Sequence, residues 1–286
     1  MNPVAVAFVI AAAVAHAGWN LFAKRVPDGG PLFIWLTGAA SAAIGVPLAV
    51  ITVLVLDQPP KPVWLLAAGV SGMLHLTYFI LLQRGYAVGD LSVVYPLARG
   101  SGPLLAVLAA VLLLGERPGV LPLIGAAAVV AGILVIGGLG AGGLTNSAGA
   151  LYGLATGLLI AGYTLWDAHA VTTLAVPPVV LLAGTMLWEA ILMSPVAWAR
   201  RERLPALWRT QWRPAVAVAV LSILAYLLVL FAMRLAPVSM VAPARELSIV
   251  FGSLAAWLIL GEPNPRRRVT GAIVVVAGVA AIAVHV

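Results

Sequence analysis

The stretches ARGSGPLLAVLAAVLLLGE at residues 98–116 and ARELSIVFGSLAAWLILGE at residues 244–262 open on the same Ala-Arg and close on the same Leu-Gly-Glu. They lie 146 positions apart, and this offset aligns residues 98–132 with residues 244–278 without a gap. About fifteen of the thirty-five aligned positions are identical. A matched arginine and a matched Leu-Gly-Glu at one offset exceed what shared apolar composition produces, so the chain is predicted to be an internal duplication.

The composition is that of an integral membrane protein. Of the 286 residues, 63% are hydrophobic and 9% are charged, and the mean hydropathy of +1.11 is far above that of soluble domains. The apolar runs are long and continuous, whereas barrel strands alternate over about 10 residues, so the runs predict transmembrane helices. Breaks at Pro, Gly and charged residues give ten candidate spans: 3–23, 31–56, 63–83, 91–114, 119–138, 148–167, 177–198, 213–233, 239–260 and 269–285.

The spans fall into two halves of five. The glycine-rich, uncharged stretch 137–149 suits a linker, which places a first repeat at residues 1–142 and a second at residues 143–286. The first spans of the two halves also match, with AGWNLF at 17–22 against AGYTLW at 161–166. An odd number of spans per repeat forces opposite orientations in the bilayer. The predicted fold is therefore an all-α membrane protein with ten transmembrane helices as two inverted five-helix repeats, an arrangement typical of secondary transporters with a site at the repeat interface.

Positive charge is concentrated in two arginine clusters. The net charge of +7 comes mostly from residues 200–213 and 266–268, which we interpret as membrane-surface anchors and topology signals rather than a nucleic-acid site. Counting lysine and arginine on alternate sides gathers both clusters with Lys24, Arg25 and Arg84, against Lys61, Arg117 and Arg234 on the other side. The positive-inside rule then predicts that the basic side is cytoplasmic and both termini are external.

Arg99 and Arg245 lie inside predicted spans, where a charged residue costs about 2.5–3.5 kcal/mol and calls for a partner or a function. Tyr95 lies one turn before Arg99 on the same helical face. A guanidinium matches a carboxylate or phosphate bidentately, so both arginines are candidates to bind an anionic group of a substrate. The alternative is a structural ion pair with Glu189 or Glu246, although Glu246, next to Arg245, would point about 100° away from it on a helix.

A polar stripe in the first span and its counterpart in the sixth are predicted to line a cavity. His16 and Asn20 lie one turn apart beside Trp19, and the equivalent face of the sixth span carries Tyr163 and Trp166. The predicted substrate-binding residues are Arg99, Arg245, Tyr95, Trp19, Asn20, His16, Tyr163 and Trp166.

Three groups are candidates to carry a coupling proton. Glu189 is mid-span with no charge near it in sequence, so it either pairs with an arginine or exchanges a proton. His16 is a candidate because histidine titrates near physiological pH. Glu246 is the third candidate.

No catalytic or metal-binding set is recognisable in the sequence. The chain has no cysteine and its four histidines are scattered, and no Ser, His and Asp come together in a pattern that suggests hydrolysis. We therefore predict no enzyme activity, no metal and no cofactor. Two alternatives to a transporter stay open: a membrane-embedded enzyme, which would need a convergent nucleophile and base, and a lipid- or head-group-binding accessory protein.

The duplicated sequence resembles the ten-helix EamA-like members of the drug/metabolite transporter superfamily. The resemblance covers essentially the whole chain: two five-helix repeats, Leu-Gly-Glu at 114–116 and 260–262 closing each fourth helix, and a glycine-rich fifth helix after it. It implies export or exchange of small metabolites such as amino acids by alternating access without ATP, and the chain has no GxxxxGK[ST] motif. The small four-helix relatives couple protons through a glutamate in the first helix, where this chain has His16.

These observations together predict a secondary active transporter in a bacterial plasma membrane, moving a small polar metabolite that is anionic or zwitterionic. The expected partners are the lipid bilayer and the small-molecule substrate, without nucleic acid, and proton coupling and a homodimer are options. The resemblance implies cytoplasmic termini for several members, in conflict with the charge count, so both orientations are carried forward.

Overall fold

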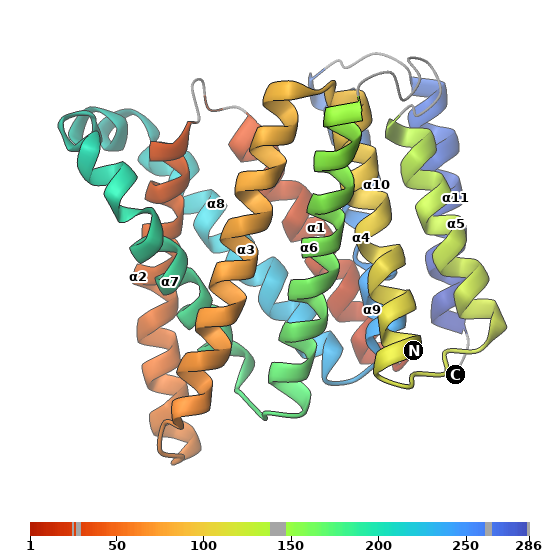
Figure 1. Ribbon diagram of the computed structural model, residues 1–286, viewed down its shortest axis with the longest axis horizontal. Coiled ribbons are helices and arrows are strands. Elements are labelled where there is room, and N and C mark those ends of the chain that lie inside the picture. The colour runs from red at the N-terminus through yellow and green to blue at the C-terminus, as the bar shows by residue number, and fades with distance from the viewer. Residues whose placement is uncertain (25, 27–29, 138–146, 261–264, 285–286) are drawn as a thin grey trace.

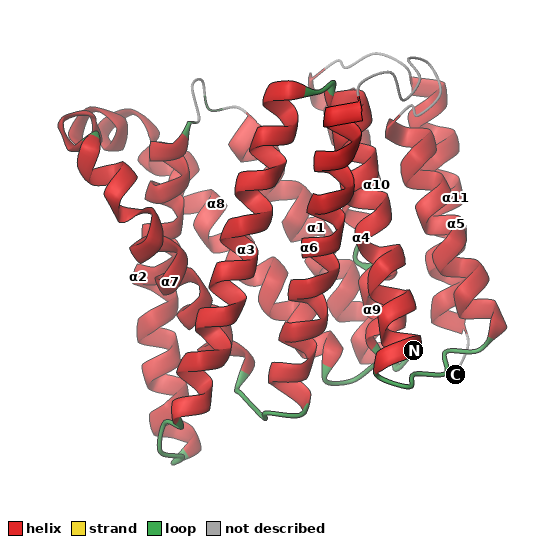
Figure 2. Cartoon of the chain, in the orientation of Figure 1, coloured by secondary structure: helices red, strands yellow, loops and turns green. Residues whose placement is uncertain are grey.

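The computed structural model describes residues 1–24, 26, 30–137, 147–260 and 265–284, and all regular elements among them are helices (Figure 1, Figure 2). Proline stands at the first position of five of these helices, where a missing N–H leaves no intrahelical bond unmade. The helices are α1 (Pro3–Lys24), α2 (Pro31–Leu56), α3 (Pro62–Val88), α4 (Leu91–Leu113), α5 (Val120–Gly137), α6 (Ser147–Thr172), α7 (Pro178–Ala199), the 3-10 turn η1 (Arg201–Arg203), α8 (Leu204–Met233), α9 (Val238–Ala244), α10 (Leu247–Leu260) and α11 (Pro265–Val284).

The described part of the chain contains the ten expected spans, in the expected order. Helices α9 and α10 together form the ninth, Val238–Ala255. Several helices extend beyond the predicted bounds, because polar residues at a span end do not stop a helix. The largest extension is in α8, whose 30 residues would measure about 45 Å, more than the roughly 30 Å of a hydrocarbon core.

The ninth span is interrupted at Arg245 and Glu246, which form a turn between α9 and α10. Pro243 lies just before the turn, and the turn's own N–H groups are satisfied: Arg245 donates to the Val241 carbonyl at 3.0 Å and Glu246 to the Pro243 carbonyl at 3.1 Å. The equivalent part of the first repeat is helical throughout α4, with Pro96 and Pro103 inside the helix. The two copies of the motif therefore differ in backbone although they share the arginine.

The two halves pack as inverted copies. Equivalent helices contact each other across the interface, α2 with α7 and α5 with α11, and the contact of α1 with α10 mirrors that of α6 with α4. A Cβ added to Gly125 would lie 2.6 Å from the Gly278 carbonyl oxygen, and one added to Gly132 would lie 2.8 Å from that of Gly271. Gly271 and Gly278 are the repeat equivalents of Gly125 and Gly132, and the pairs run in opposite directions. Helices α5 and α11 are thus antiparallel and pack backbone to backbone through small residues, as membrane helices do.

The Leu-Gly-Glu motif of the first repeat joins the two halves. Gly115, at φ +69°, ends the fourth span in a left-handed conformation that glycine adopts without strain. The Glu116 carboxylate then accepts the backbone N–H groups of Val238 and Ser239, each at 2.9 Å, at the start of α9. The motif therefore ends one helix at Gly115 and caps another through Glu116. Its counterpart Glu262 lies outside the described residues, as does most of the glycine-rich stretch 137–149.

Charge is distributed unequally between the two ends of the bundle. Figure 1 shows the N-terminus and the last turn of α11 at one end, and the helix ends that carry the arginine clusters, around η1 and the start of α11, at the other. The structure thus places the two clusters on one side, as the alternation of spans predicts.

Candidate functional site

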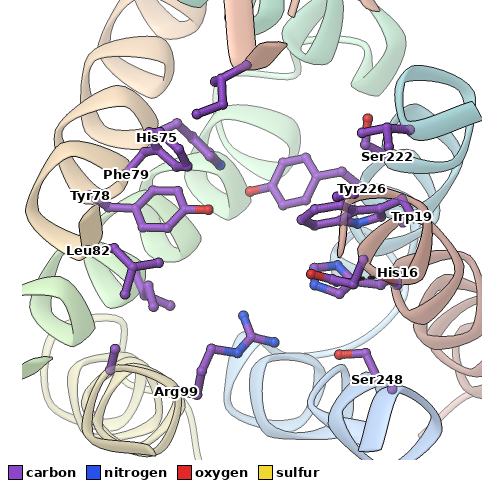
Figure 3. Close-up of a pocket in the computed structure, with 18 of the residues that line it drawn as sticks. His16, Trp19, His75, Tyr78, Phe79, Leu82, Arg99, Ser222, Tyr226 and Ser248 are labelled. Carbon is purple, nitrogen blue, oxygen red and sulfur yellow. Dashed lines mark hydrogen bonds between the residues drawn. The ribbon is translucent and has the colours of Figure 1, made fainter. Parts of the chain in front are cut away.

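A cavity of about 1120 Å³ lies between the two halves. Its deep part is formed by residues from α1, α3, α4, α6, α8 and α10, several of which are drawn in Figure 3. Its outer part is lined by Trp35 at the start of α2, Tyr86 near the end of α3 and Arg268 at the start of α11. These positions are at the basic end of the bundle, so the cavity opens toward that end.

Arg99 points into the cavity from α4 (Figure 3). One guanidinium nitrogen, Nη2, is 2.8 Å from Oε2 of Glu246, and the Arg99 side chain keeps 16% of its surface exposed. Its Nε is buried and has no hydrogen-bond partner among the described residues. Of the two acids that sequence offered as its partner, Glu246 is the one that pairs, and the guanidinium still has an unused donor.

Arg245 lies at the helix interruption and is buried. Its Nε donates to Glu246 Oε1 at 3.3 Å, its Nη2 donates to the Tyr163 hydroxyl at 3.2 Å, and its guanidinium lies 5.5 Å from the centre of the Tyr163 ring. The separation of about 100° expected between neighbours on a helix does not apply because the helix is broken here. Arg245 lines a side pocket of about 50 Å³ next to the main cavity.

The two arginines and one carboxylate form a cluster with a formal charge of +1, from two positive charges and one negative. Because Glu246 is shared, neither guanidinium is neutralised by an acid of its own. A buried cluster with an excess positive charge is electrostatically suited to an anionic guest. Arg99 is the member that lines the cavity, whereas Arg245 is held behind it by Tyr163.

The predicted residues of α1 lie together on the cavity wall. The rings of His16 and Trp19 meet edge to face, 5.0 Å apart. Asn20 donates from Nδ2 to the His16 carbonyl at 2.7 Å, within its own helix. All three line the cavity, as the stripe predicts.

Aromatic rings form a second wall. Tyr163 of α6 stacks on His75 of α3, with ring centres 4.0 Å apart and an angle of 29°. Tyr78 and Tyr226 contact the same pair of rings. His75, Tyr78, Tyr163 and Tyr226 all line the cavity, and so does Tyr95. Tyr226 was not among the residues predicted from the sequence, although Ser222, which also lines the cavity, lies one turn before it on α8.

Two predicted residues behave differently from the rest. Glu189 lines the cavity from α7, and within the described part of the chain it makes neither an ion pair nor a hydrogen bond. Trp166 lies outside the residues that line the cavity, and its indole Nε1 donates to the Ala67 carbonyl of α3 at 2.9 Å. Trp166 thus holds α6 against α3.

Two further sets of charged residues lie at or next to the cavity, although the sequence did not predict them there. Asp167, the last residue of the predicted sixth span, is completely buried and accepts a hydrogen bond from the Tyr226 hydroxyl. Arg267 and Arg268, interpreted as part of a surface cluster, line the outer cavity, and Arg268 Nη1 donates to the Ser253 carbonyl at 3.4 Å. The first turn of α11 faces inward at the cavity mouth, which the run of three arginines alone does not reveal. Within the described ranges, no group of three or more His, Asp or Glu is arranged to hold a metal ion.

Comparison with known proteins gives a family and a fold. Residues 3–138 and 147–284 each match the family described as the EamA-like transporter family. A solved structure titled "Crystal structure of protein" superposes with a TM-score of 0.76, covering 98% of this chain and 96% of that one at 21% identity, which shows a shared fold. No curated protein matches the chain significantly. Each repeat matches the family, and the described residues form ten helices that are long and apolar enough to span a membrane. The chain therefore belongs to the EamA-like transporter family of the drug/metabolite transporter superfamily.

Proposed function

We propose that this protein is a secondary transporter of a small zwitterionic metabolite of the amino-acid type, which it exports or exchanges by alternating access. The observation that carries the proposal is the Arg99 guanidinium, which lines a cavity between inverted repeats and belongs to a side chain that keeps 16% of its surface exposed. A substrate carboxylate would bind there, next to a cluster whose formal charge is +1. Charge-assisted hydrogen bonds of this kind contribute about 1.5–3 kcal/mol each.

The zwitterionic character rests on Glu189. This carboxylate lines the same cavity as Arg99 and is free of ion pairs with described residues, so it is available to a substrate's ammonium group. The aromatic wall of Tyr78, Tyr163 and Tyr226 supports the same assignment, because aromatic faces attract cations. An anion without an amine would leave Glu189 unused.

The arginine-rich end of the bundle supports one orientation of the protein in the membrane. The positive-inside rule supports a cytoplasmic location for the basic end, and the cavity opens toward that end. This is the state that would load an exporter from the cytoplasm.

The orientation can be tested by labelling. Because the chain has no cysteine, single Asp57→Cys and Arg84→Cys variants can be labelled in intact cells with a membrane-impermeant maleimide. Asp57 follows α2 and Arg84 is near the end of α3, so the two positions lie at opposite ends of the bundle. We expect the thiol of the Asp57→Cys variant to be labelled and that of the Arg84→Cys variant to be protected. Labelling of the Arg84→Cys variant alone would reverse the orientation.

The test of function is counterflow in proteoliposomes. Each radiolabelled amino acid is compared with its decarboxylated amine and its deaminated acid, so that both charged ends of the substrate are tested. Arg99→Ala is expected to abolish uptake of the amino acid, Arg99→Lys to retain a reduced rate because it keeps charge without the bidentate fork, and Arg84→Ala, an exposed arginine outside the cavity, to leave it unchanged. Full activity of folded Arg99→Ala would refute the role of Arg99.

A further inference from the structure

We infer that Asp167 is a proton-binding site, separate from the substrate cavity and connected to it through the Tyr226 hydroxyl. The use of this proton in coupled transport rests on the proposed function, whereas the site itself does not. Asp167 is thus a different residue from the three candidates for a coupling proton that the sequence suggested, His16, Glu189 and Glu246.

The Asp167 carboxylate is enclosed but incompletely bonded. It lies on α6 with 0% of its surface exposed. Its Oδ2 accepts a hydrogen bond from Tyr226 on α8, and the Ser71 hydroxyl of α3 is a second donor close to the carboxylate. Its Oδ1 is buried and accepts no hydrogen bond of good geometry from the described residues. A buried acceptor without a donor costs about 1–3 kcal/mol, and more when it is charged. A proton on this carboxylate would remove the charge, and a small displacement would allow the new O–H to donate.

The groups that face Asp167 do not include a direct cationic partner among the described residues. Helix α3 contributes His75 and Ser71, α8 contributes Tyr226, and the turn after α9 contributes Arg245. Glu189 of α7 is close enough to interact with it as a second acid. Helix α4, which also packs against α6, carries Arg99, but that guanidinium is paired with Glu246.

Arg245 is likewise committed elsewhere. Its donors go to Glu246 and to the Tyr163 hydroxyl, so it acts on Asp167 only through space. The His75 ring has its Nδ1 2.9 Å from the Ser71 carbonyl, which can only accept, so Nδ1 carries the hydrogen. The carboxylate is therefore not part of a closed ion pair.

The site fits a proton better than a metal cation. A sodium or calcium ion needs several oxygen ligands, and here the hydroxyl of Tyr226 directs its hydrogen, not its lone pairs, at the carboxylate. No cluster of three or more acidic or histidine side chains surrounds this position in the described ranges.

A route for the proton connects the carboxylate with the cavity. Tyr226 and His75 line the cavity, and Asp167 does not. A proton from cavity water binds the phenolic oxygen of Tyr226 as the original phenolic proton moves to Asp167 Oδ2. Tyr226 ends as a neutral phenol, Asp167 changes from −1 to neutral, and one proton leaves the cavity. Substrate at Arg99 and the proton on Asp167 would thus occupy different places.

The position is suited to coupling the proton to movement of the halves. Asp167 joins α6 to α8 through Tyr226, and its neighbour Trp166 joins α6 to α3 through the Ala67 carbonyl. Loss of one buried charge at this three-helix contact changes the relative stability of arrangements that enclose it or expose it to water. The aligned position in the first repeat, 144 residues earlier, is Ala23, so only one half carries the acid.

The experiment measures protonation of Asp167 directly by acid-minus-alkaline infrared difference spectroscopy of the reconstituted protein. Asp28, Asp57 and Asp90 are replaced by Asn, which leaves Asp167 as the only aspartate of the chain, and thermal melting verifies folding. We expect one protonated-carboxyl band to appear in acid and to shift when the protein is made with ¹³C-labelled aspartate. The absence of any aspartate-sensitive band would overturn the inference without reference to transport.

Two variants then test the route and its use. Tyr226→Phe is expected to show the same final band with a slower rise after an acid jump, and an unchanged rate would overturn the route. Asp167→Asn is expected to keep amino-acid counterflow and lose accumulation driven by a proton gradient. Retained gradient-driven accumulation would overturn the coupling role, whereas absence of counterflow in the unmodified protein would count against the proposed function and leave the infrared result standing.

Discussion

Arg99 of the first repeat is ion-paired at 2.8 Å with Glu246 of the second repeat, and the same carboxylate holds Arg245, the repeat equivalent of Arg99. The two arginines of the duplication therefore converge on one acid. This contact crosses the interface between the halves, at the depth where the cavity ends. Its consequence is that the position of the Arg99 guanidinium and the packing of the halves depend on the same side chain.

Removing the shared acid should destabilise the protein more than removing the cavity arginine. Glu246→Gln leaves the buried Arg245 and the partly buried Arg99 without a counter-ion, and breaking a buried pair from one side costs about 3–5 kcal/mol. We expect a lower thermal unfolding midpoint in detergent for Glu246→Gln than for Arg99→Met. The double variant Arg99→Met with Glu246→Gln should recover part of the loss, because one of the unpaired charges is gone. Additive losses would contradict the shared pair.

The Tyr163 hydroxyl should matter through Arg245 rather than through its ring. Tyr163→Phe keeps the stacking on His75 at 4.0 Å and removes the 3.2 Å hydrogen bond from Arg245. A hydrogen bond to a charged group contributes about 1.5–3 kcal/mol, so the unfolding midpoint should fall. Tyr152→Phe on the same helix is the control, since the Tyr152 hydroxyl has no hydrogen bond within the described part of the chain. Equal midpoints for the two variants would argue against this role of the hydroxyl.

The backbone contact of α5 with α11 should not tolerate a methyl group. A Cβ at position 132 would meet the Gly271 carbonyl oxygen at 2.8 Å and Val275 Cγ2 at 2.6 Å, so Gly132→Ala must push the helices apart. Gly162→Ala is the matched control, because nothing lies within 4 Å of the added Cβ there and alanine favours the helix by about 1 kcal/mol. Gly132→Ala is expected to lower the unfolding midpoint and Gly162→Ala to maintain or raise it, measured under the same detergent conditions.

The cap supplied by Glu116 should contribute to folding and leave substrate affinity intact. Glu116→Gln removes the charge and one of the two acceptor oxygens that bind the N–H groups of Val238 and Ser239, at a cost of about 0.5–2 kcal/mol. The exposed Glu202→Gln controls for loss of a negative charge. Binding of an amino-acid substrate, measured by calorimetry on folded protein, should be unchanged in both variants. A weaker substrate affinity in Glu116→Gln alone would indicate that the cap reaches the site.

The repeat made the fold predictable, because a pattern of matched residues constrains topology more strongly than any single span does. An arginine in a span at residue 99 with a counterpart at residue 245 indicated paired polar sites near a symmetry axis. The stripe of His16 and Asn20 indicated a cavity wall, because helical spacing puts these residues on one face. These inferences use only periodicity and self-similarity, which are properties of the chain itself.

The contacts that decide the site depend on tertiary structure and so could not be predicted. Glu246 reaches both arginines only because the helix is broken beside it, and α4 of the first repeat is not broken although Pro96 lies inside it. Asp167 is near the end of the predicted sixth span, and only the longer helix shows that it is enclosed by α3 and α8. Arg267 lines the cavity because α11 begins one turn earlier than predicted.

The interruption between α9 and α10, which α4 lacks, shows that the two repeats have diverged since the duplication. An antiparallel pair of identical chains would be obliged to carry the same residue at both copies of every position, so an arginine that binds substrate in one copy would also bind it in the other. Fusion of the two copies into a single gene removes this constraint, because each copy can then change separately. Here one descendant of the ancestral arginine faces the cavity on an unbroken helix, and the other has become a buried structural group beside a glutamate that the first copy lacks. A symmetric scaffold thus came to hold one asymmetric site.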